Sequence, residues 1–352
     1  MRLQPGTIYF ARETNLDGKG YTDLVKIGLV EDPRTDRDRL ADHQTGNPRK
    51  LEFIEGHSVK TAAVKYVESQ MHRAFASKRI QGEWFRFTSE SEIQAAVEKA
   101  KALAFEVGSR VHIFAEAQDL EKVFNQGDIK PSTPDLIELR DRVLVNQEIL
   151  NRYGSLTSKI RSAMVEAIAE EGKEVEKYMI EQITYHEPKF STTKFKKLFG
   201  KTHKELIEQC TSKEEKPYQD FHLIEEGLGL SIPEDTETLI RNLDAEVDDA
   251  VTARDFYRLN NLLLQIREDS AFFEWEVDFD EAQIKVACGE APGIEDVCVW
   301  IRELRLGRAS FDKAKLASLA PDLYYQGFEE KKPTIKRVPK WYKTDEEDNN
   351  VS

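Results

Sequence analysis

A pair of short segments near the start of the chain constrains its fold most. Residues 7–11 and 24–28 are rich in β-branched and aromatic side chains, and a polar loop with two glycines joins them. This pattern is typical of two strands in a β-hairpin. Because strand side chains alternate between faces, burying the aliphatic residues leaves Tyr9 and Lys26 side by side on the other face. An ordinary half-buried hairpin with both groups in water is the alternative interpretation.

The rest of the first 125 residues alternates between helix and strand patterns. The expected elements are a helix that begins at about residue 33 and ends before residues 45–48, a strand at 51–56, a helix at 58–77, a strand at 84–87, a helix at 90–106 and a last strand at 111–115. This alternation predicts a small α+β domain over residues 1–125 with a trailing helix.

One acidic residue on the helix at 58–77 is unusual. Apolar residues recur at helical spacing from Val64 to Phe75, and on a helical wheel Glu68 lies inside the stripe that they form. A carboxylate in this position costs free energy unless it is paired, hydrogen-bonded or bound to a cation. A rim position or an internal salt bridge is one interpretation. A metal-binding glutamate is the other.

The preceding helix carries further candidates. Arg39 and His43 are four residues apart and therefore lie on one helix face, with Arg37 in the same segment. A guanidinium can bind two phosphate oxygens at once, which makes Arg39 a candidate for contacting phosphate. The many charged neighbours of these residues also allow a simpler interpretation, a solvated helix face.

The overall charge limits the ways in which this chain can bind nucleic acid. Its 352 residues contain 51 Lys and Arg against 65 Asp and Glu, a net charge of −14. This argues against a protein that coats nucleic acid over its whole surface. The charge is uneven, however, because residues 1–88 carry a net +3 and the remainder −17. A local site for nucleic acid in the first quarter of the chain is compatible with this distribution.

The sequence also indicates a cellular setting. No stretch has the length and apolar character of a signal peptide or a membrane span. The three cysteines form no Cys-x-x-Cys pair, so neither a disulfide framework nor a zinc cluster is expected. We therefore expect a cytoplasmic protein that does not bind membranes.

The pattern changes after residue 125. Residues 126–135 contain two prolines and little apolar content, which is typical of a linker. The regions expected beyond it are a helical domain at 136–270, a small helical, DNA-binding module at 271–328 and a disordered tail at 329–352. Within the small module we expect a strand-like piece at 272–286 and a short helix at 293–306. The acidic helices offer a surface for a protein partner.

Two stretches of this region are basic. Residues 189–204 interleave six lysines with phenylalanines, a pattern that suits either a nucleic-acid backbone or an amphipathic helix with inward aromatics. Residues 299–316 carry a net +3 and resemble the helicase-associated domain, with a tryptophan, a basic helix and a glycine turn. That resemblance implies that Arg302, Arg305 and Arg308 contact DNA phosphates. A core tryptophan with solvated arginines is the alternative.

The N-terminal motifs together resemble the GIY-YIG nuclease superfamily, in the branch named after a phage open reading frame. The motifs are Tyr9, Lys26-Ile27-Gly28, Arg39, Glu68 with His72, and Gly82-Glu83-Trp84-Phe85. They occur in the family's order over residues 6–88. The resemblance implies an α+β domain with a small three-stranded antiparallel sheet flanked by helices, followed here by a mainly α-helical C-terminal region.

The same resemblance implies one-metal hydrolysis of phosphodiester bonds in DNA. Tyr9 would position or activate the attacking water, Arg39 would stabilise charge on the phosphate, and Glu68 would hold Mg²⁺ or Mn²⁺. His43 and His72 would carry protons or contact phosphate. Lys26 replaces the family's second tyrosine, where a cation can still stabilise phosphate charge. The asparagine that often closes such sites has no clear match.

We therefore expect a metal-dependent DNA endonuclease from bacterial or phage restriction, defence or mobile-element biology. The residues expected to carry catalysis are Tyr9, Lys26, Arg39, His43, Glu68 and His72, with substrate contacts from Arg37, Arg302, Arg305 and Arg308. A non-catalytic nucleic-acid-binding or assembly module on the same fold is the alternative. A third interpretation is a scaffold whose acidic helices bind a basic partner. The sequence does not determine the oligomeric state.

Overall fold

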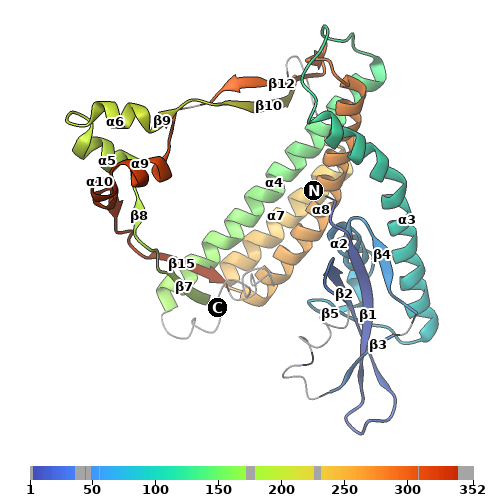
Figure 1. Cartoon of the computed structure of the whole chain (residues 1–352). Coiled ribbons are helices and arrows are strands. Elements are labelled where there is room, and N and C mark those ends of the chain that lie inside the picture. Colours follow the sequence, from blue (N-terminus) through green and yellow to red (C-terminus); the bar gives the residue numbers. More distant parts are fainter. Residues whose placement is uncertain are drawn as a thin grey trace. The chain divides into compact units, whose positions relative to one another are not determined.

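The computed structural model describes residues 3–35, 44, 49–54, 56–171, 179–225, 231–307 and 309–339. The chain folds into two compact units. Unit 1 consists of Met1–Met164 and Asp220–Ile301, and unit 2 of Val165–Gln219 and Arg302–Ser352. Figure 1 shows their helices and strands. Among the described residues, no helix combines the length and the apolar character that crossing a membrane requires.

Unit 1 begins with an antiparallel hairpin of β1 (Gly6–Thr14) and β2 (Tyr21–Glu31), as the sequence pattern predicts. The shorter strands are β3 (Leu51–Phe53), β4 (Val59–Thr61), β5 (Arg79–Gln81) and β6 (Trp84–Arg86). Their order is β3-β1-β2-β6-β5, and β4 also pairs with β1. The three-stranded sheet expected from the sequence is therefore a six-stranded one. The extra strands arise because β3 and β4 both pair with β1, while the β5–β6 hairpin extends the sheet beyond β2.

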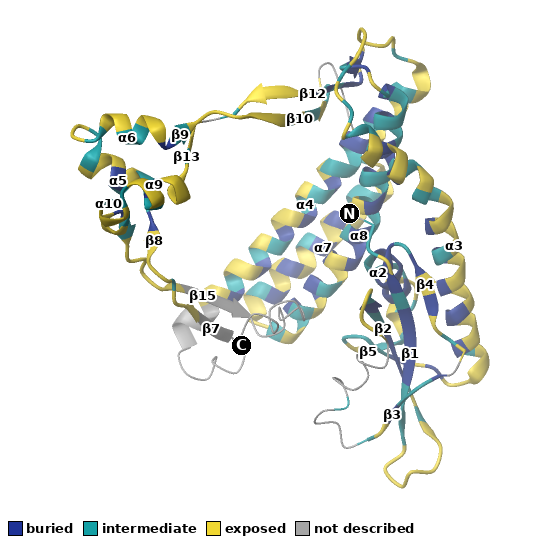
Figure 2. Cartoon of the chain, viewed as in Figure 1, coloured by how far each residue is buried: buried dark blue, intermediate teal, exposed yellow. Residues whose placement is uncertain are grey.

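Two helices cover the aliphatic face of the hairpin. They are α2 (Val64–Ala74), which is followed by the short 3₁₀ helix η1 (Ala76–Lys78), and α3 (Glu90–Leu120). The core between sheet and helices includes Ile8, Phe10, Val25, Ile27, Val64, Val67 and Met71. The strand expected at 111–115 lies inside α3, because Val107, Phe114 and Ala117 recur at helical spacing and are all buried. Figure 2 shows this division between buried and exposed faces.

Long helices form much of the rest of unit 1. They are α4 (Pro134–Glu171), which continues into unit 2, α7 (Glu234–Ala253) and α8 (Phe256–Cys288). The Trp275 ring of α8 is fully buried, stacks on Tyr66 of α2 at 4.7 Å and lies 5.1 Å from Phe114. The strand-like piece expected at 272–286 is therefore helical, and it belongs to the same core as the N-terminal sheet. The mainly helical character expected after residue 125 is confirmed in the described chain.

The boundaries of the two compact units differ from those of the expected domains. Residues 126–135 connect α3 to α4 within unit 1, and the Gln126 backbone N–H donates to the Glu290 carbonyl at 2.8 Å. Helix α8 continues through residues 270 and 271, where a boundary is expected. In the expected tail, a strand β15 (Thr334–Pro339) pairs with β7 (Met179–Thr184), and residues from 340 onward lie outside the described ones.

Residues 298–306 are a strand, although the sequence predicts a helix over 293–306. Strands β10 (Glu215–Leu223) and β12 (Cys298–Leu306) each run from one unit into the other, and β11 (Gly293–Ile294) pairs with β12. The physical reason is a period of two in burial. Cys298, Trp300 and Arg302 are buried, whereas the residues between them are partly exposed. Trp300 is thus a core residue, as in the alternative interpretation of this segment.

The remainder of unit 2 in the described ranges includes a small module of short elements. In chain order these are β8 (Lys189–Phe190), α5 (Thr192–Phe199), α6 (Lys204–Gln209), β9 (Thr211–Ser212), β13 (Ser310–Phe311), α9 (Lys313–Leu319), α10 (Pro321–Gln326) and β14 (Phe328–Glu329). Phe190, Phe195, Cys210 and Leu316 form its buried core. The module is therefore built from two segments that are about 100 residues apart in the sequence.

Candidate functional site

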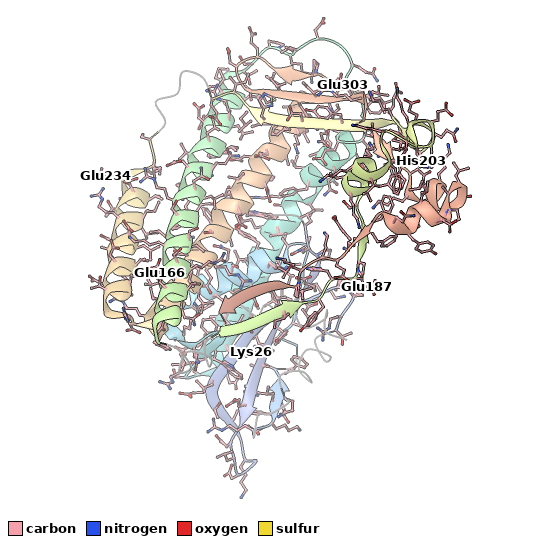
Figure 3. The ribbon with its side chains drawn as sticks, turned by 90° about the vertical axis from the view of Figure 1, so that its left-hand side faces the viewer. Lys26, Glu166, Glu187, His203, Glu234 and Glu303 are labelled. Carbon is pink, nitrogen blue, oxygen red and sulfur yellow. The ribbon has the colours of Figure 1, made fainter. Side chains whose placement is uncertain are left out.

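The hairpin places Tyr9 and Lys26 on the same face of the sheet, as the strand period predicts. Tyr9 is paired with Gly28, and Ala11 with Lys26, so these four residues point to one side. The face is not solvated, because Tyr9 is 1% exposed and Lys26 is 6% exposed. Figure 3 labels Lys26 on this sheet. The simple interpretation of two polar groups in water is therefore wrong.

Gly28 is required by the position of the Tyr9 ring. A Cβ atom at residue 28 would lie 2.5 Å from the Tyr9 hydroxyl oxygen and 2.6 Å from its Cζ. Both distances are far below van der Waals contact, so any larger residue would push the ring away. The ring also packs edge-to-face with Phe53, with the ring centroids 5.6 Å apart. The glycine of the Lys-Ile-Gly motif therefore fixes where the phenol lies.

Lys26 is held by the hairpin of β5 and β6. Its ammonium forms an ion pair with the Glu83 carboxylate. Glu83 follows Gly82, which has a φ of 53°, a conformation that glycine adopts without strain. The Glu83 carbonyl also accepts a hydrogen bond from the Ile27 backbone N–H at 3.1 Å. The Gly-Glu-Trp-Phe motif thus supplies the counter-ion of Lys26, a role that its position in the sequence did not indicate.

Glu68 is buried on α2, as its place in the apolar stripe predicts. It is 9% exposed, and burial raises the pKa of its carboxyl to about 7. The nearby charge of His72 acts to lower this pKa, Glu83 acts to raise it, and Arg267 and Lys26 act to lower it. The carboxylate therefore lies among both positive and negative groups. Part of the free energy lost on burying it is offset by the cations.

His72 lies one turn after Glu68 and joins three elements. Its Nε2 donates to the Ile27 carbonyl of β2 at 2.9 Å, and its Nδ1 lies 3.4 Å from Oε1 of Glu268 on α8. Burial lowers the pKa of His72, but the bond to Glu268, the charge of Glu68 and the bond to Ile27 outweigh it, so the net change is upward. Both ring nitrogens face acceptors, an arrangement that favours the doubly protonated ring.

Two acidic residues of α8 complete this network, and sequence analysis missed both. Glu268 Oε1 lies 2.6 Å from Nη2 of Arg79, and Asp269 Oδ1 lies 3.1 Å from Nε of Arg73. Both carboxylates are buried, and burial raises the pKa of Asp269 despite the nearby Arg73. The available signal was the same as for Glu68, acidic residues flanked by apolar ones on a helix. Their partners, however, are almost 200 residues away in the chain.

Six further residues are predicted from the sequence to belong to the site. Arg37, Arg39 and His43 lie outside the described residues, as does Arg308. Arg302 belongs to unit 2 and is 1% exposed, so its guanidinium is not available to a DNA phosphate in this conformation. Arg305 pairs with Glu303 and lies over the Tyr218 ring at 3.6 Å from its centroid. The structure therefore places Tyr9 and Lys26 on one face of the hairpin, and it places Glu68 where the charges of His72 and Lys26 act on it. Arg302 is a buried residue of unit 2.

The donor set limits the kind of metal that the site can hold. In the ranges that the structure describes, no group of three or more His, Cys, Asp or Glu residues is arranged to hold a metal ion. Mg²⁺ is commonly bound through one or two carboxylates, with water and substrate phosphate as its other ligands. A buried Glu68 influenced by the Glu83 carboxylate fits such a site.

Comparisons with known proteins support the N-terminal resemblance. Residues 6–101 match the T5orf172 domain, a nuclease-like domain family related to phage open reading frames. No curated protein and no solved structure matches this chain. The match spans roughly a quarter of the chain, from β1 into α3. Tyr9, Lys26, Glu68 and His72 therefore all lie in the segment that is similar to a nuclease-like domain family.

Proposed function

We propose that this protein is a metal-dependent endonuclease that hydrolyses phosphodiester bonds in DNA. The observation that carries the proposal is the buried Glu68 carboxylate, which lies next to His72 and within the influence of Lys26, inside the segment that matches a nuclease-like family. A buried acid with a strongly raised pKa in such surroundings is typical of functional sites. The setting that we infer is bacterial or phage restriction, defence or mobile-element biology, in the cytoplasm.

Each residue has a role in the proposed reaction. Tyr9 orients the water whose oxygen attacks phosphorus, and Lys26 and Arg39 stabilise the charge that grows on the phosphate oxygens. Glu68 would hold Mg²⁺ or Mn²⁺, which supplies Lewis-acid stabilisation of the phosphate and the leaving oxygen. Arg37 contacts the substrate backbone. The leaving oxygen takes up a proton, for which His43 is the candidate donor.

His72 is better suited to positioning than to proton transfer. Its two ring nitrogens face the Ile27 carbonyl and the Glu268 carboxylate. A ring engaged on both sides holds β2 against α2 and has no nitrogen left for substrate. We therefore propose that the pair of His72 and Glu268 fixes the backbone between Lys26 and Gly28, and with it the position of Tyr9.

The proposal is tested by incubating plasmid DNA with Mg²⁺ or Mn²⁺ and the wild-type or the Glu68→Gln protein. Glutamine keeps the size of the side chain and removes its charge, so nicking should be lost while the fold is retained. The matched control is Glu98→Gln, because Glu98 lies exposed on α3 in a surface pair with Lys101. This variant should cleave like the wild type. Unchanged nicking by Glu68→Gln would sink the assignment.

One observation favours a second function, a non-catalytic nucleic-acid-binding or assembly module. Lys26 occupies the position of the second tyrosine in the GIY-YIG resemblance, and its ammonium is buried against Glu83. This function predicts that DNA is retained in a gel-shift assay with no metal-dependent products. Cleavage that depends on both Glu68 and the metal would exclude it. Docking of a basic protein on the acidic helical region stays a prediction, to be examined by co-purification.

A further inference from the structure

Unit 2 contains an internal repeat, which the structure shows and the sequence analysis did not find. The segments 189–212 and 310–329 each run strand, helix, helix, strand. Residues 121 positions apart correspond: Phe190 and Phe311, Ser191 and Asp312, Lys194 and Lys315, Phe195 and Leu316, Leu198 and Leu319. The shared pattern is too short to be evident in the sequence alone. We call the two segments the first and the second repeat.

The backbones of the two repeats are paired reciprocally. Strand β8 pairs with β14, and β13 pairs with β9, so each repeat's first strand joins the other repeat's last strand. The Ser191 N–H donates to the Gly327 carbonyl at 2.9 Å, and the Asp312 N–H donates to the Cys210 carbonyl at 2.7 Å. Contacts that occur twice with exchanged partners describe an approximate two-fold symmetry.

The equivalent side chains do the same work in both repeats. The Ser191 side chain accepts a hydrogen bond from the N–H of Lys194 and so caps α5, and Asp312 does the same for Lys315 in α9. Phe195 and Leu316, in the middle of these helices, are both fully buried. The first helix of each repeat is therefore capped and packed in the same way.

The repeats differ sharply in charge. The first contains six lysines against two glutamates, a net +4, whereas the second contains two lysines against three acidic residues, a net −1. Lys196, Lys197, Lys201 and Lys204 of the first repeat are all exposed. The counterparts of Lys196 and Lys197 are Ala317 and Ser318. Because the second repeat has the same order of helices and strands with alanine and serine at these two positions, that order does not require a lysine at either of them.

These four lysines, which we call the α5–α6 lysines, all lie within residues 196–204. Lys196 and Lys197 lie at the end of α5, Lys201 lies in the turn of residues 200–203, and Lys204 begins α6. Figure 2 colours residues of both helices as exposed, and Figure 3 labels His203 in the turn between them. Lys204 lies 3.8 Å from Glu208, an exposed pair that contributes little. Concentrated positive charge of this kind suits a polyanion with regularly spaced charges.

We propose that the α5–α6 lysines bind the phosphate backbone of duplex DNA and anchor the protein to it, independently of the cleavage site. Choosing duplex DNA among polyanions rests on the proposed function, whereas the repeat and its charge asymmetry do not. Lysine contacts to phosphates position a protein without reading sequence. The proposal also replaces the predicted phosphate contacts of Arg302 and Arg305. Arg302 is buried, and Arg305 is paired with Glu303.

The test measures DNA binding in the absence of divalent metal, so that it does not depend on cleavage. The full chain carrying Glu68→Gln is titrated onto fluorescein-labelled duplex DNA over a range of salt concentrations, and binding is followed by anisotropy. The α5–α6 variant adds Lys196→Gln, Lys197→Gln, Lys201→Gln and Lys204→Gln. Each lost phosphate contact should lower the salt dependence, the slope of log K against log salt, by about 1.

The matched control removes the same charge elsewhere in unit 2, through Lys313→Gln, Lys315→Gln, Lys331→Gln and Lys332→Gln, all of which are exposed. The α5–α6 variant should lose about tenfold or more in affinity, and the control should lose much less. Arginine at the same four α5–α6 positions keeps the charge and should restore binding, which separates a lost contact from a lost fold. Equal losses in both glutamine variants, or unchanged binding, would overturn the proposal. So would competition by polyglutamate as effective as that by unlabelled DNA.

The result remains separate from that of the nuclease test. A wild-type protein that binds through the α5–α6 lysines but never cleaves would disprove the proposed function alone. A protein that cleaves in a Glu68-dependent way, yet binds equally well without these lysines, would disprove the anchoring proposal alone.

Discussion

Two groups of charged residues, one in each unit, lie in opposite environments. In unit 1, Lys26, Glu68, His72 and Glu268 are each less than a tenth exposed, and each interacts with an opposite charge or a hydrogen-bond partner. In the first repeat of unit 2, the α5–α6 lysines face solvent. The charges of the first group are therefore buried inside the fold, whereas those of the second group are exposed to solvent.

This difference allows the effects of substitutions on stability to be distinguished from their effects on function. Removing one member of a buried charge network leaves its partner uncompensated in a medium of low dielectric, which is costly. Removing an exposed charge costs almost nothing, because water already solvates it. Changes in the buried network should therefore affect folding and activity together, whereas changes in the exposed group should affect binding alone.

The largest effect is expected for Glu268→Ala. This change leaves His72 and Arg79 without their shared carboxylate, and it should reduce the free energy of unfolding by about 3 kcal/mol. Denaturation in urea measures this loss. Lys204→Ala, which breaks an exposed pair of unit 2, should change it by less than about 0.5 kcal/mol. Similar losses of unfolding free energy in the two variants would contradict the distinction between the buried and the exposed charges.

Glu268→Gln tests the positioning role apart from stability. The amide keeps an acceptor for His72 and Arg79, so the fold should survive at moderate temperature. We expect the cleavage rate at saturating DNA to fall while DNA affinity stays at the wild-type value, because the site is distorted but the anchor is not. A purely structural role predicts instead that the folded fraction cleaves normally.

A smaller effect is expected for Gly28→Ala. The new Cβ would lie 2.5 Å from the Tyr9 hydroxyl oxygen, so the ring must move, at a cost of about 1–3 kcal/mol. The shift of Tyr9 should also slow cleavage. Gly108→Ala is the matched control, because a Cβ there meets nothing within 4 Å in the middle of α3. It should stabilise the protein by about 0.5–1 kcal/mol. Thermal unfolding of both variants checks the signs.

A further effect concerns the pH dependence of stability, measured without metal. The pKa of Glu68 is raised from 4.5 to about 7, so between these values the folded state holds a proton that the unfolded state has lost. The stability contributed by this group is therefore fully present below about pH 4.5 and is lost as the pH rises through about 7. The difference in unfolding free energy between wild type and Glu68→Gln should decrease over this window. A flat or rising difference would contradict the burial of a protonated Glu68.

The sequence predicted those parts of the site that depend on neighbours close in the chain. The period of two placed Tyr9 and Lys26 on one face of the hairpin, and the helical period placed Glu68 in the buried stripe of α2. The burial of the hairpin's second face was not predicted. The sequence pattern also did not predict that residues 298–306 form a strand. Their period of two becomes clear only from the burial of Trp300 and Arg302 in the structure.

By itself, then, the sequence determined which side chains share a face of a strand or helix, because those relations depend only on backbone periodicity. The tertiary structure alone decided that Glu268 of α8 reaches His72, and that Phe190 and Phe311 lie in equivalent positions of one module. Both depend on contacts between residues more than 100 positions apart. No local period specifies which distant apolar faces pack together, since that choice is made by burial of the whole core.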